Sequence, residues 1–230
     1  MRSYGSLSTA FYDLDKPAAP AEAMAYYLRR ALQSNGPVLE PMCGSGRFLL
    51  PLLQAGVAIE GVDLSADMLT ACRRRAEALG LVATLHEQSL EALSLPRRYG
   101  FAFIPSGSLG LVPPKESLRA SLRALRRHLT PGAVLLVELD DKSGFEESSA
   151  TGSRAVVVEG DSVIHYEWHM TRDCGSDTVH WSGRYQRRDA GSVLAEEFEE
   201  IALQLYGTQE DLDELQLAGF SGAHVVEATE

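Results

Sequence analysis

The sequence predicts an α/β protein with a doubly wound, mostly parallel seven-stranded sheet and an inserted antiparallel β meander as a cap. From Pro20 to Leu139, apolar runs of strand length alternate with amphipathic runs of helix length, as in parallel sheets covered on both faces. From residue 140 the segments become long, β-rich and separated by Gly, Asp and Ser turns. We expect an N-terminal lid and cofactor-binding core over 1–139, a cap and substrate region over 140–205, and a helix and strand over 206–230 that complete the core.

The first half provides five predicted strands and the helices between them. Ser65 is a favourable N-cap for the helix that follows it, and Gly80 is a plausible C-terminal stop for the same helix. The expected strands are GPVLEPM (36–42), VAIEGVDL (57–64), LVATLHE (81–87), YGFAFIP (99–105) and GAVLLVELD (132–140), and further helices are expected over 20–33, 47–54 and 116–128.

The second half provides the meander and the C-terminal elements. Thr208 with Asp211 forms a capping pattern for a helix that ends near Leu217. The meander segments are RAVVVEG (154–160), SVIHYEWHMTR (162–172), DTVHWSGRYQRR (177–188) and SVLAEEFEEIALQLYG (192–207), and the closing strand is AHVVEAT (223–229).

Composition limits the possible partners and compartments. The 230 residues are 45% hydrophobic, enough for a packed core. A formal net charge of −11 would repel a phosphate backbone, so we expect no nucleic acid partner. The three cysteines form no close pair, which argues against a disulfide framework and a zinc site. The sequence has no signal-peptide pattern and no apolar run long enough to span a membrane, so we expect a cytoplasmic protein with no membrane partner. We also expect no bound metal and a monomer or homodimer.

The glycine turn after the first predicted strand is the main candidate binding motif. Gly44 and Gly46 let the backbone approach a ligand, and Asp63 at the end of the second strand can accept both hydroxyls of a ribose. The alternative is a structural turn with a solvated Asp63. The dinucleotide pattern fails at Leu49, where its third glycine should stand, and Glu40 suits a cationic ligand better than a pyrophosphate. A ligand with a ribose, an ammonium and a sulfonium would satisfy both acids.

At these residues the chain resembles a known family. VLEPMCGSGRFLLPLLQAGVAIEGVDLSADML looks like motif I and the second strand of the class I S-adenosylmethionine-dependent methyltransferases, of the small-molecule type. AGFSGAHVVEA resembles that family's closing helix and strand, and TAFYDLDKP resembles the tyrosine-bearing N-terminal segment of its small-molecule members. Three departures are Met42, where the motif has its first glycine, Pro41, which stiffens the strand end, and Gly100, where the fourth strand usually begins with Asp.

The resemblance implies S-adenosylmethionine as the cofactor and assigns roles to individual residues. Glu40 and the glycines would line the methionine portion, and Asp63 would hold the ribose. Gln88 stands where the family often has Asp beside the adenine, and an amide can both accept and donate there. The implied cofactor residues are Tyr12, Glu40, Gly44, Gly46, Arg47, Asp63, Leu64, Met68, Gln88, Ser89 and Leu90.

The acceptor is less constrained by the sequence. IPSGSLGLVPP (104–114) lacks the Asp/Asn/Ser-Pro-Pro-aromatic motif of enzymes that methylate nucleobase amines, which favours a small-molecule acceptor. Strand alternation places His165 and His169 on one face of the meander and Trp168 on the other. Either face could line the pocket. The candidate acceptor residues are Tyr4, Ser106, Ser108, Trp168, Trp181 and Tyr185.

We therefore predict methyl transfer from S-adenosylmethionine to a nitrogen or oxygen of a small, ring-containing metabolite by in-line displacement. His165 and His169 are candidate catalytic bases, and a mechanism without a base is an alternative. Two further alternatives are a nicotinamide-dependent oxidoreductase and a non-catalytic S-adenosylmethionine-binding protein.

Overall fold

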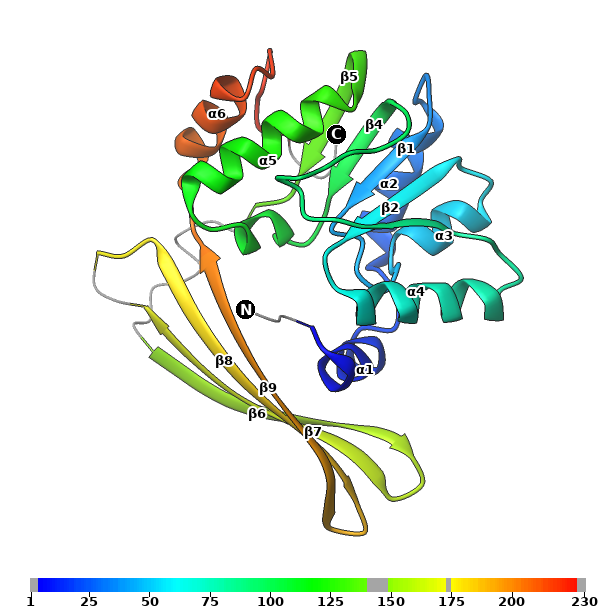
Figure 1. Ribbon diagram of the computed structural model, residues 1–230, viewed down its shortest axis with the longest axis vertical. Helices are drawn as coiled ribbons and strands as arrows, with labels where there is room; N and C mark the ends of the chain where they lie inside the picture. The colour runs from blue at the N-terminus through cyan, green and yellow to red at the C-terminus, as the bar shows by residue number, and fades with distance from the viewer. Residues whose placement is uncertain (1–3, 140–148, 173–174, 227–230) are drawn as a thin grey trace.

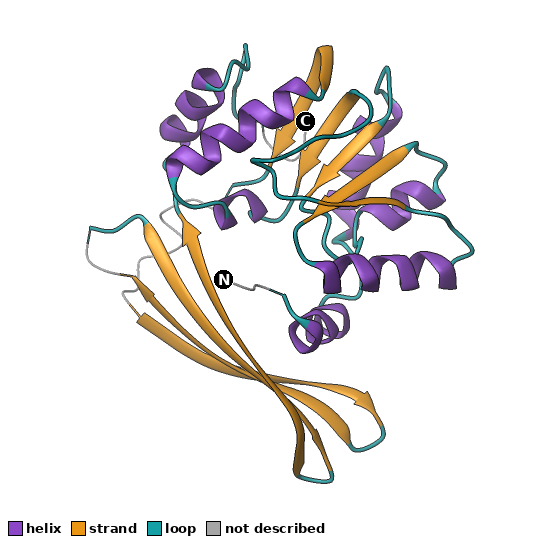
Figure 2. Ribbon diagram, viewed as in Figure 1, coloured by secondary structure: helices purple, strands orange, loops and turns teal. Residues whose placement is uncertain are grey.

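The computed structural model describes residues 4–139, 149–172 and 175–226. These residues form a parallel sheet covered by helices and a separate antiparallel sheet, with one helix between the two parts (Figures 1 and 2). No helix in this described part of the chain is long and apolar enough to cross a membrane.

The parallel sheet has the strand order β3-β2-β1-β4-β5. The order reverses between β1 and β4, so the carboxyl end of β1 lies at the place where open α/β sheets bind ligands. The strands are β1 (Val38–Pro41), β2 (Ile59–Asp63), β3 (Thr84–Glu87), β4 (Tyr99–Ile104) and β5 (Leu129–Val137).

Apolar layers cover both faces of the parallel sheet. Helices α2 (Ala21–Leu32), α3 (Leu49–Gln54) and α4 (Ala66–Ala78) contribute to one core cluster, which includes Phe101 and Phe103 of β4. On the other face, Leu118, Leu122 and Leu125 of α5 (Lys115–Arg127) are buried with Tyr206 and Ala218, which flank α6 (Thr208–Leu217). The central strands β1, β2 and β4 are therefore buried along nearly their whole length, whereas the edge strands β3 and β5 are more exposed.

The predicted meander is confirmed as a four-stranded antiparallel sheet in the order β6-β7-β8-β9. Its strands are β6 (Ser149–Glu159), β7 (Ser162–Arg172), β8 (Thr178–Asp189) and β9 (Ser192–Gln204). It meets the core at the short 3₁₀ helix η1 (Ser108–Leu111), where a Cβ on Gly110 would lie 2.8 Å from Leu203 Cδ1. The backbones of η1 and β9 can approach this closely because residue 110 is glycine.

Helix α1 (Ser6–Asp15) joins the antiparallel sheet to the core. Its Phe11 ring packs 5.0 Å from the ring of Tyr166 and 5.6 Å from that of Tyr185, measured between centroids. At its C-terminal end, Asp13 pairs with Arg75 of α4 at 3.2 Å, and Asp15 pairs with Arg154 of β6 at 2.7 Å. The N-terminal segment therefore contacts both parts of the molecule (Figure 1).

Three expected details differ from the structure. The described residues contain five parallel strands, so the seven-strand count is not confirmed. Of the expected closing strand, residues 223–226 have no strand conformation and residues 227–229 lie outside the described part. Helix α3 begins at Leu49 rather than at residue 47, because the residues before it form turns. The N-cap of α6 is Gly207 rather than Thr208, since the Glu210 carboxylate accepts from the Gly207 N–H at 2.8 Å.

Gly46 is required for packing of the core, and a comparison with Gly56, which has nearly the same backbone conformation, tests this. A Cβ there would lie 2.6 Å from Cys72 Sγ and 2.9 Å from Leu50 Cγ, at a φ of +82°. Gly56 has nearly the same φ, +83°, but a Cβ there would meet nothing within 4 Å. We expect Gly56→Ala to lower the free energy of unfolding by about 1 kcal/mol, from left-handed strain alone. Gly46→Ala should cost about 1–3 kcal/mol more because the methyl group overpacks the core.

Chemical denaturation of the two variants measures this difference. Equal losses of stability would contradict the assignment of Gly46 to core packing.

Candidate functional site

A pocket of about 520 Å³ lies at the carboxyl ends of β1 and β2, between the parallel sheet and the start of α1. Motif residues from four separate places in the chain meet there. The side chains and backbone that line it include eight of the predicted cofactor residues: Tyr12, Gly44, Asp63, Leu64, Met68, Gln88, Ser89 and Leu90.

Asp63 fixes the edge of this pocket. One carboxylate oxygen accepts from the Gly44 N–H at 2.8 Å, and the other accepts from the Ser65 N–H at 2.8 Å. Burial raises the pKa of Asp63, and these backbone hydrogen bonds oppose that effect by favouring the ionised form. The carboxylate thus holds the glycine turn against the N-terminus of α4, where the Ser65 hydroxyl accepts from the Met68 N–H at 3.1 Å.

Glu40 lies beneath the glycine turn and does not line the pocket. Its side chain is 2% exposed, and one of its carboxylate oxygens has no hydrogen-bond partner among the described residues. Burial, and next the charge of Asp63, raise the pKa of Glu40 well above its usual value. A backbone hydrogen bond from Leu49 and the charge of Arg47 act against these effects, but a buried carboxylate with one unpartnered oxygen remains costly to fold.

Arg47 also lies outside the lining. Its guanidinium donates to the Ser106 hydroxyl at 2.8 Å and stands 5.7 Å from the centre of the Tyr12 ring. It therefore connects the turn after β1 with the turn after β4. The sequence placed Arg47 and Ser106 in different roles, cofactor and acceptor, whereas the structure brings them into direct contact.

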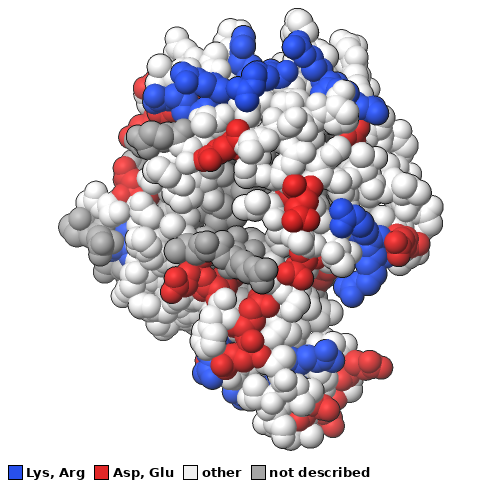
Figure 3. Space-filling view, in the orientation of Figure 1, with Lys and Arg blue, Asp and Glu red and all other residues white. Residues whose placement is uncertain are grey.

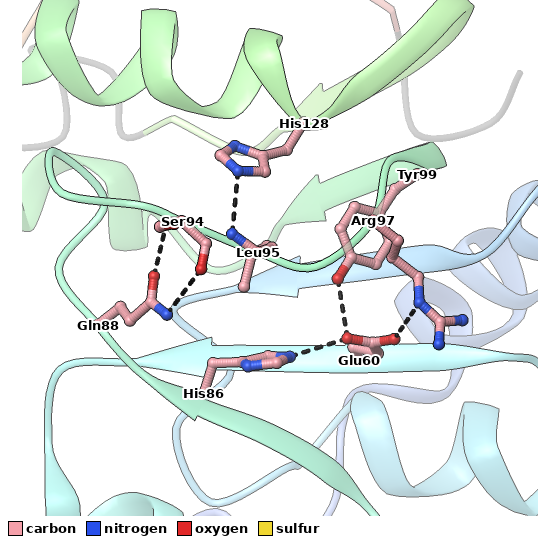
Figure 4. A network of polar contacts seen from close by, with 8 residues as sticks. All are labelled: Glu60, His86, Gln88, Ser94, Leu95, Arg97, Tyr99 and His128. Carbon is pink, nitrogen blue, oxygen red and sulfur yellow. Dashed lines mark hydrogen bonds and ion pairs between the residues drawn. The ribbon is translucent and has the colours of Figure 1, made fainter.

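The loop after β3 is held closed by Gln88. The Gln88 side-chain amide donates to the Ser94 carbonyl at 3.0 Å and accepts from the Ser94 N–H at 2.8 Å (Figure 4). The next residue, Leu95, donates its N–H to His128 Nε2 at 3.0 Å. The Gln88 side chain thus shapes the loop, and residues 88–90 line the pocket.

Another group of polar contacts in Figure 4 lies away from the pocket. Glu60, at the start of β2, accepts from the hydroxyl of Tyr99 at 2.8 Å, contacts His86 Nε2 at 2.8 Å and pairs with Arg97 at 3.1 Å. A buried carboxylate with three partners stabilises the sheet, and we assign this group a structural role.

The charged groups around the pocket are mainly acidic. Asp63, Asp67, Glu87 and Glu91 line it, and the described lining contains no Lys or Arg. Figure 3 shows Asp and Glu side chains near the central hollow and a band of Lys and Arg across the top of the molecule. This arrangement favours a ligand that carries positive charge. No group of three or more His, Cys, Asp or Glu that could hold a metal occurs among the described residues.

Comparison with known proteins identifies the family. Residues 38–132 match a family described as a methyltransferase domain. Over 185 residues the chain is 32% identical to the dTDP-3-amino-3,6-dideoxy-alpha-D-glucopyranose N,N-dimethyltransferase of Streptomyces fradiae, covering 80% of this chain and 70% of that one. The chain belongs to the S-adenosylmethionine-dependent methyltransferases. The predicted enzyme class and cofactor are thereby confirmed, and the nicotinamide-dependent alternative is not favoured.

Solved structures with lower identity share the methyltransferase fold. The sugar N-methyltransferase KedS8 from Streptoalloteichus matches with a TM-score of 0.77 at 22% identity, over 95% of this chain and 86% of that one. CalS10, an amino pentose methyltransferase from Micromonospora echinaspora solved with S-adenosylmethionine, matches with a TM-score of 0.69 at 19% identity, over 95% and 90%.

Ser108 and Tyr4 are the predicted acceptor residues that line the methyltransferase's pocket. The Ser108 hydroxyl donates to the Pro105 carbonyl at 2.9 Å, as a residue that caps a turn does. Ser106 lies outside the lining, and its N–H donates to the Glu138 carboxylate at 2.7 Å.

The aromatic residues of the meander face the core but do not line the pocket. Tyr185 stacks on Tyr166 at 4.4 Å, and Trp181 stacks on Trp168 at 4.6 Å. The first pair packs against α1, so these side chains support the pocket from behind.

His165 and His169 lie on the opposite face of the sheet from the rings that pack on α1. His169 is exposed, and neither histidine contributes to the pocket lining. A base must come within hydrogen-bond reach of the proton that it removes. The geometry therefore gives no support to these histidines as catalytic bases, and we do not assign them that role.

Several lining residues were not predicted as contacts. Ser65, Leu111, Val112, Pro113 and Ser121 belong to this set. Ser65 could have been found, because the N-cap beside Asp63 must stand at the same sheet edge. The others follow β4 in the chain, Leu111, Val112 and Pro113 in the connection to α5 and Ser121 within α5, and only the tertiary fold places them at the pocket.

Glu40→Gln tests how much the buried carboxylate of Glu40 destabilises the folded protein. We expect the variant to gain about 1–3 kcal/mol in the free energy of unfolding at neutral pH, because the buried carboxylate is replaced by a neutral amide. The pKa of Glu40 is raised in the folded protein, so the wild type has its full stability below the usual carboxyl pKa and loses stability as pH rises from there towards the raised pKa. The advantage of the variant should therefore shrink towards acid pH.

Denaturation with urea across that pH range measures the effect. Glu77→Gln, at an exposed position of α4, is the matched control and should show no such gain. If Glu40→Gln were no more stable than the wild type at any pH, the claim that the buried carboxylate of Glu40 destabilises the protein would be contradicted.

Proposed function

We propose that this enzyme methylates the amino group of an amino sugar. The observation that carries the proposal is the 32% identity, over 80% of the chain, with a relative named as an amino-sugar N,N-dimethyltransferase. A second relative, from Streptomyces venezuelae, is named as a dimethyltransferase of a related dTDP-amino sugar and is 31% identical over 121 residues, which is 53% of this chain and 49% of that one. The acidic surroundings of the pocket also favour the binding of an amino group.

The described residues fit the cofactor in the following arrangement. Each oxygen of Asp63 accepts one backbone N–H and keeps a further lone pair, so the carboxylate can also accept the ribose hydroxyls. The backbone of residues 88–90 and the apolar side chain of Leu90 would contact the adenine. Glu40 lies beneath the glycine turn and outside the pocket lining, so it would act on the ammonium of the methionine portion through its charge rather than by direct contact. Arg47 would approach the carboxylate of that portion.

The chemistry needs little from side chains beyond positioning. When bound, S-adenosylmethionine supplies a methyl group that is already activated on its sulfonium. The acceptor would need a neutral amine whose lone pair lies in line with that methyl group, and the proton that the methylated amine carries would pass to water. The described pocket has no histidine in its lining, in agreement with the base-free alternative. Tyr4, Tyr12 and the segment 111–113 would exclude bulk water and hold the acceptor in line.

A turnover assay tests the proposal. The enzyme is incubated with S-adenosylmethionine and amino sugars presented free, as nucleoside diphosphate derivatives and as glycosides, and mass spectrometry locates the added methyl groups. We expect methylation at nitrogen, with kcat/KM rising with pH to a plateau set by the pKa of the acceptor amine. His165→Ala and His169→Ala should leave kcat/KM within about twofold of the wild-type value, since surface changes have small effects.

Two results would count against this assignment. Transfer to a hydroxyl group, with no turnover of any amine, would overturn the amino-sugar proposal. A pH limb near the histidine range that disappears in His165→Ala would overturn the base-free mechanism.

Asp63→Asn tests the cofactor arrangement. The substitution removes the negative charge that strengthens hydrogen bonds from the ribose hydroxyls. It also places the side-chain NH₂ group, a donor, opposite one of the two backbone N–H groups that Asp63 accepts from. We expect S-adenosylhomocysteine to bind about tenfold to a hundredfold more weakly in calorimetry. Asp67→Asn, in the same lining, is the control, and we expect a change of less than about threefold because its effect on the helix dipole is small. Unchanged affinity in folded Asp63→Asn would remove Asp63 from the cofactor site.

A further inference from the structure

Strand β9 presents two carboxylates to the N-terminal segment. Glu197 and Glu199 are two residues apart, so they lie on the same face of the strand. Both accept hydrogen bonds from residues that lie about 190 positions earlier in the chain. This contact joins the antiparallel sheet to the residues that form one wall of the cofactor pocket.

Glu197 caps helix α1 from outside the helix. The residue at the N-cap position is Gly5, which has no side chain to accept from the free N–H groups of the first turn. The Glu197 carboxylate accepts from the Leu7 N–H at 2.9 Å, the Ser8 N–H at 3.0 Å and the Ser8 hydroxyl at 2.6 Å. A negative charge at this end of a helix is also favoured by the helix dipole.

Gly5 is needed for this contact. A Cβ at that position would lie 2.6 Å from a carboxylate oxygen of Glu197. The Glu197 carboxylate occupies the space that a side chain at residue 5 would fill, so any larger residue there would displace the carboxylate from its position over α1.

Glu199 holds the next part of the segment. It is 4% exposed, and one oxygen accepts from the Tyr4 N–H at 2.6 Å while the other accepts from the Tyr185 hydroxyl at 3.1 Å. On its other side, the Tyr4 carbonyl accepts from the Ser65 hydroxyl at 2.7 Å. Tyr4 is thus bonded at one end to the antiparallel sheet and at the other to the residue beside Asp63.

These bonds act on residues that form the pocket wall. Tyr4, Gly5 and Tyr12 all line the cofactor pocket, and the Tyr4 and Tyr12 rings meet edge to face at 6.1 Å. Apolar contacts such as that of Phe11 would anchor α1 at less cost than a buried carboxylate. Directed hydrogen bonds to Tyr4, Leu7 and Ser8 add what apolar packing does not, a fixed position of the backbone over the pocket.

We propose that Glu197 and Glu199 are positioning residues that keep the N-terminal segment closed over bound cofactor. The antiparallel sheet therefore controls cofactor retention, although in the described structure none of its residues lines the cofactor pocket. The inference concerns the cofactor step alone and stands whether or not the acceptor is an amino sugar.

The test measures dissociation of S-adenosylhomocysteine from the full-length enzyme by stopped-flow fluorescence. We expect Glu197→Leu and Glu199→Leu to raise the dissociation rate and the KM for S-adenosylmethionine about tenfold to a hundredfold, because each loses hydrogen bonds to a charged acceptor. The KM for any acceptor that the enzyme turns over should change much less. Glu197→Gln and Glu199→Gln keep an acceptor oxygen and should recover most of the lost retention.

Glu196→Leu is the matched control. Glu196 lies on the opposite face of β9 and pairs with Arg184 at 2.7 Å, without contact to the N-terminal segment. We expect wild-type dissociation in this variant. Dissociation as slow as that of the wild type in folded Glu199→Leu and Glu197→Leu, or an equal acceleration in Glu196→Leu, would overturn the proposal.

If a leucine variant does not fold, a truncated protein that lacks residues 1–4 provides a second test. It removes the Tyr4 contacts to Glu199 and Ser65 while leaving β9 unchanged. Fast dissociation is expected, and wild-type dissociation would contradict the proposed role of Glu199. Because S-adenosylhomocysteine binding needs no acceptor, failure here is distinct from failure of the amino-sugar proposal.

Discussion

The two hydrogen bonds accepted by Asp63 are the constraint on which the rest of the site depends. They join the N–H of Gly44, after β1, to the N–H of Ser65, before α4, through one half-buried carboxylate. Without this contact the glycine turn and the helix N-terminus would be separate loops at the sheet edge. With it they form a rigid corner, and the backbone of Gly44 becomes one wall of the pocket.

The corner extends into a longer series of hydrogen bonds that reaches the antiparallel sheet. Ser65 bonds to Asp63 through its N–H and to the Tyr4 carbonyl through its hydroxyl, and Tyr4 donates to Glu199 of β9. The parallel and antiparallel sheets are thus connected through the pocket wall as well as through the packing of α1. Because every donor in this series has an acceptor, the connection is specific in position, which apolar packing alone does not ensure.

The sequence predicted the five strands of the parallel sheet, the glycine turn and the place of Asp63, because these depend on local patterns. Strand and helix periodicities identify β1 to β5, and the glycine turn and Asp63 lie at the ends of two neighbouring strands. The roles of Glu197 and Glu199 had no local signal, since their partners are about 190 residues away. Alternation correctly separated His165 from Trp168 but could not tell which face meets the core, because that depends on Phe11 of α1.

Backbone strain is concentrated at the same edge of the sheet. Met42 and Ser106 have positive φ values, 59° and 60°, and they follow β1 and β4, the strands that flank the reversal of strand order. Left-handed conformations of such residues cost of order 1–2 kcal/mol and persist only where the surroundings fix them. Here the Cys43 N–H donates to the Val62 carbonyl at 2.9 Å, and the Gly44 N–H donates to Asp63, so the residues after Met42 determine its conformation. The family's glycine could be replaced by methionine because the turn is held by its neighbours, and the side chain gained lines the pocket.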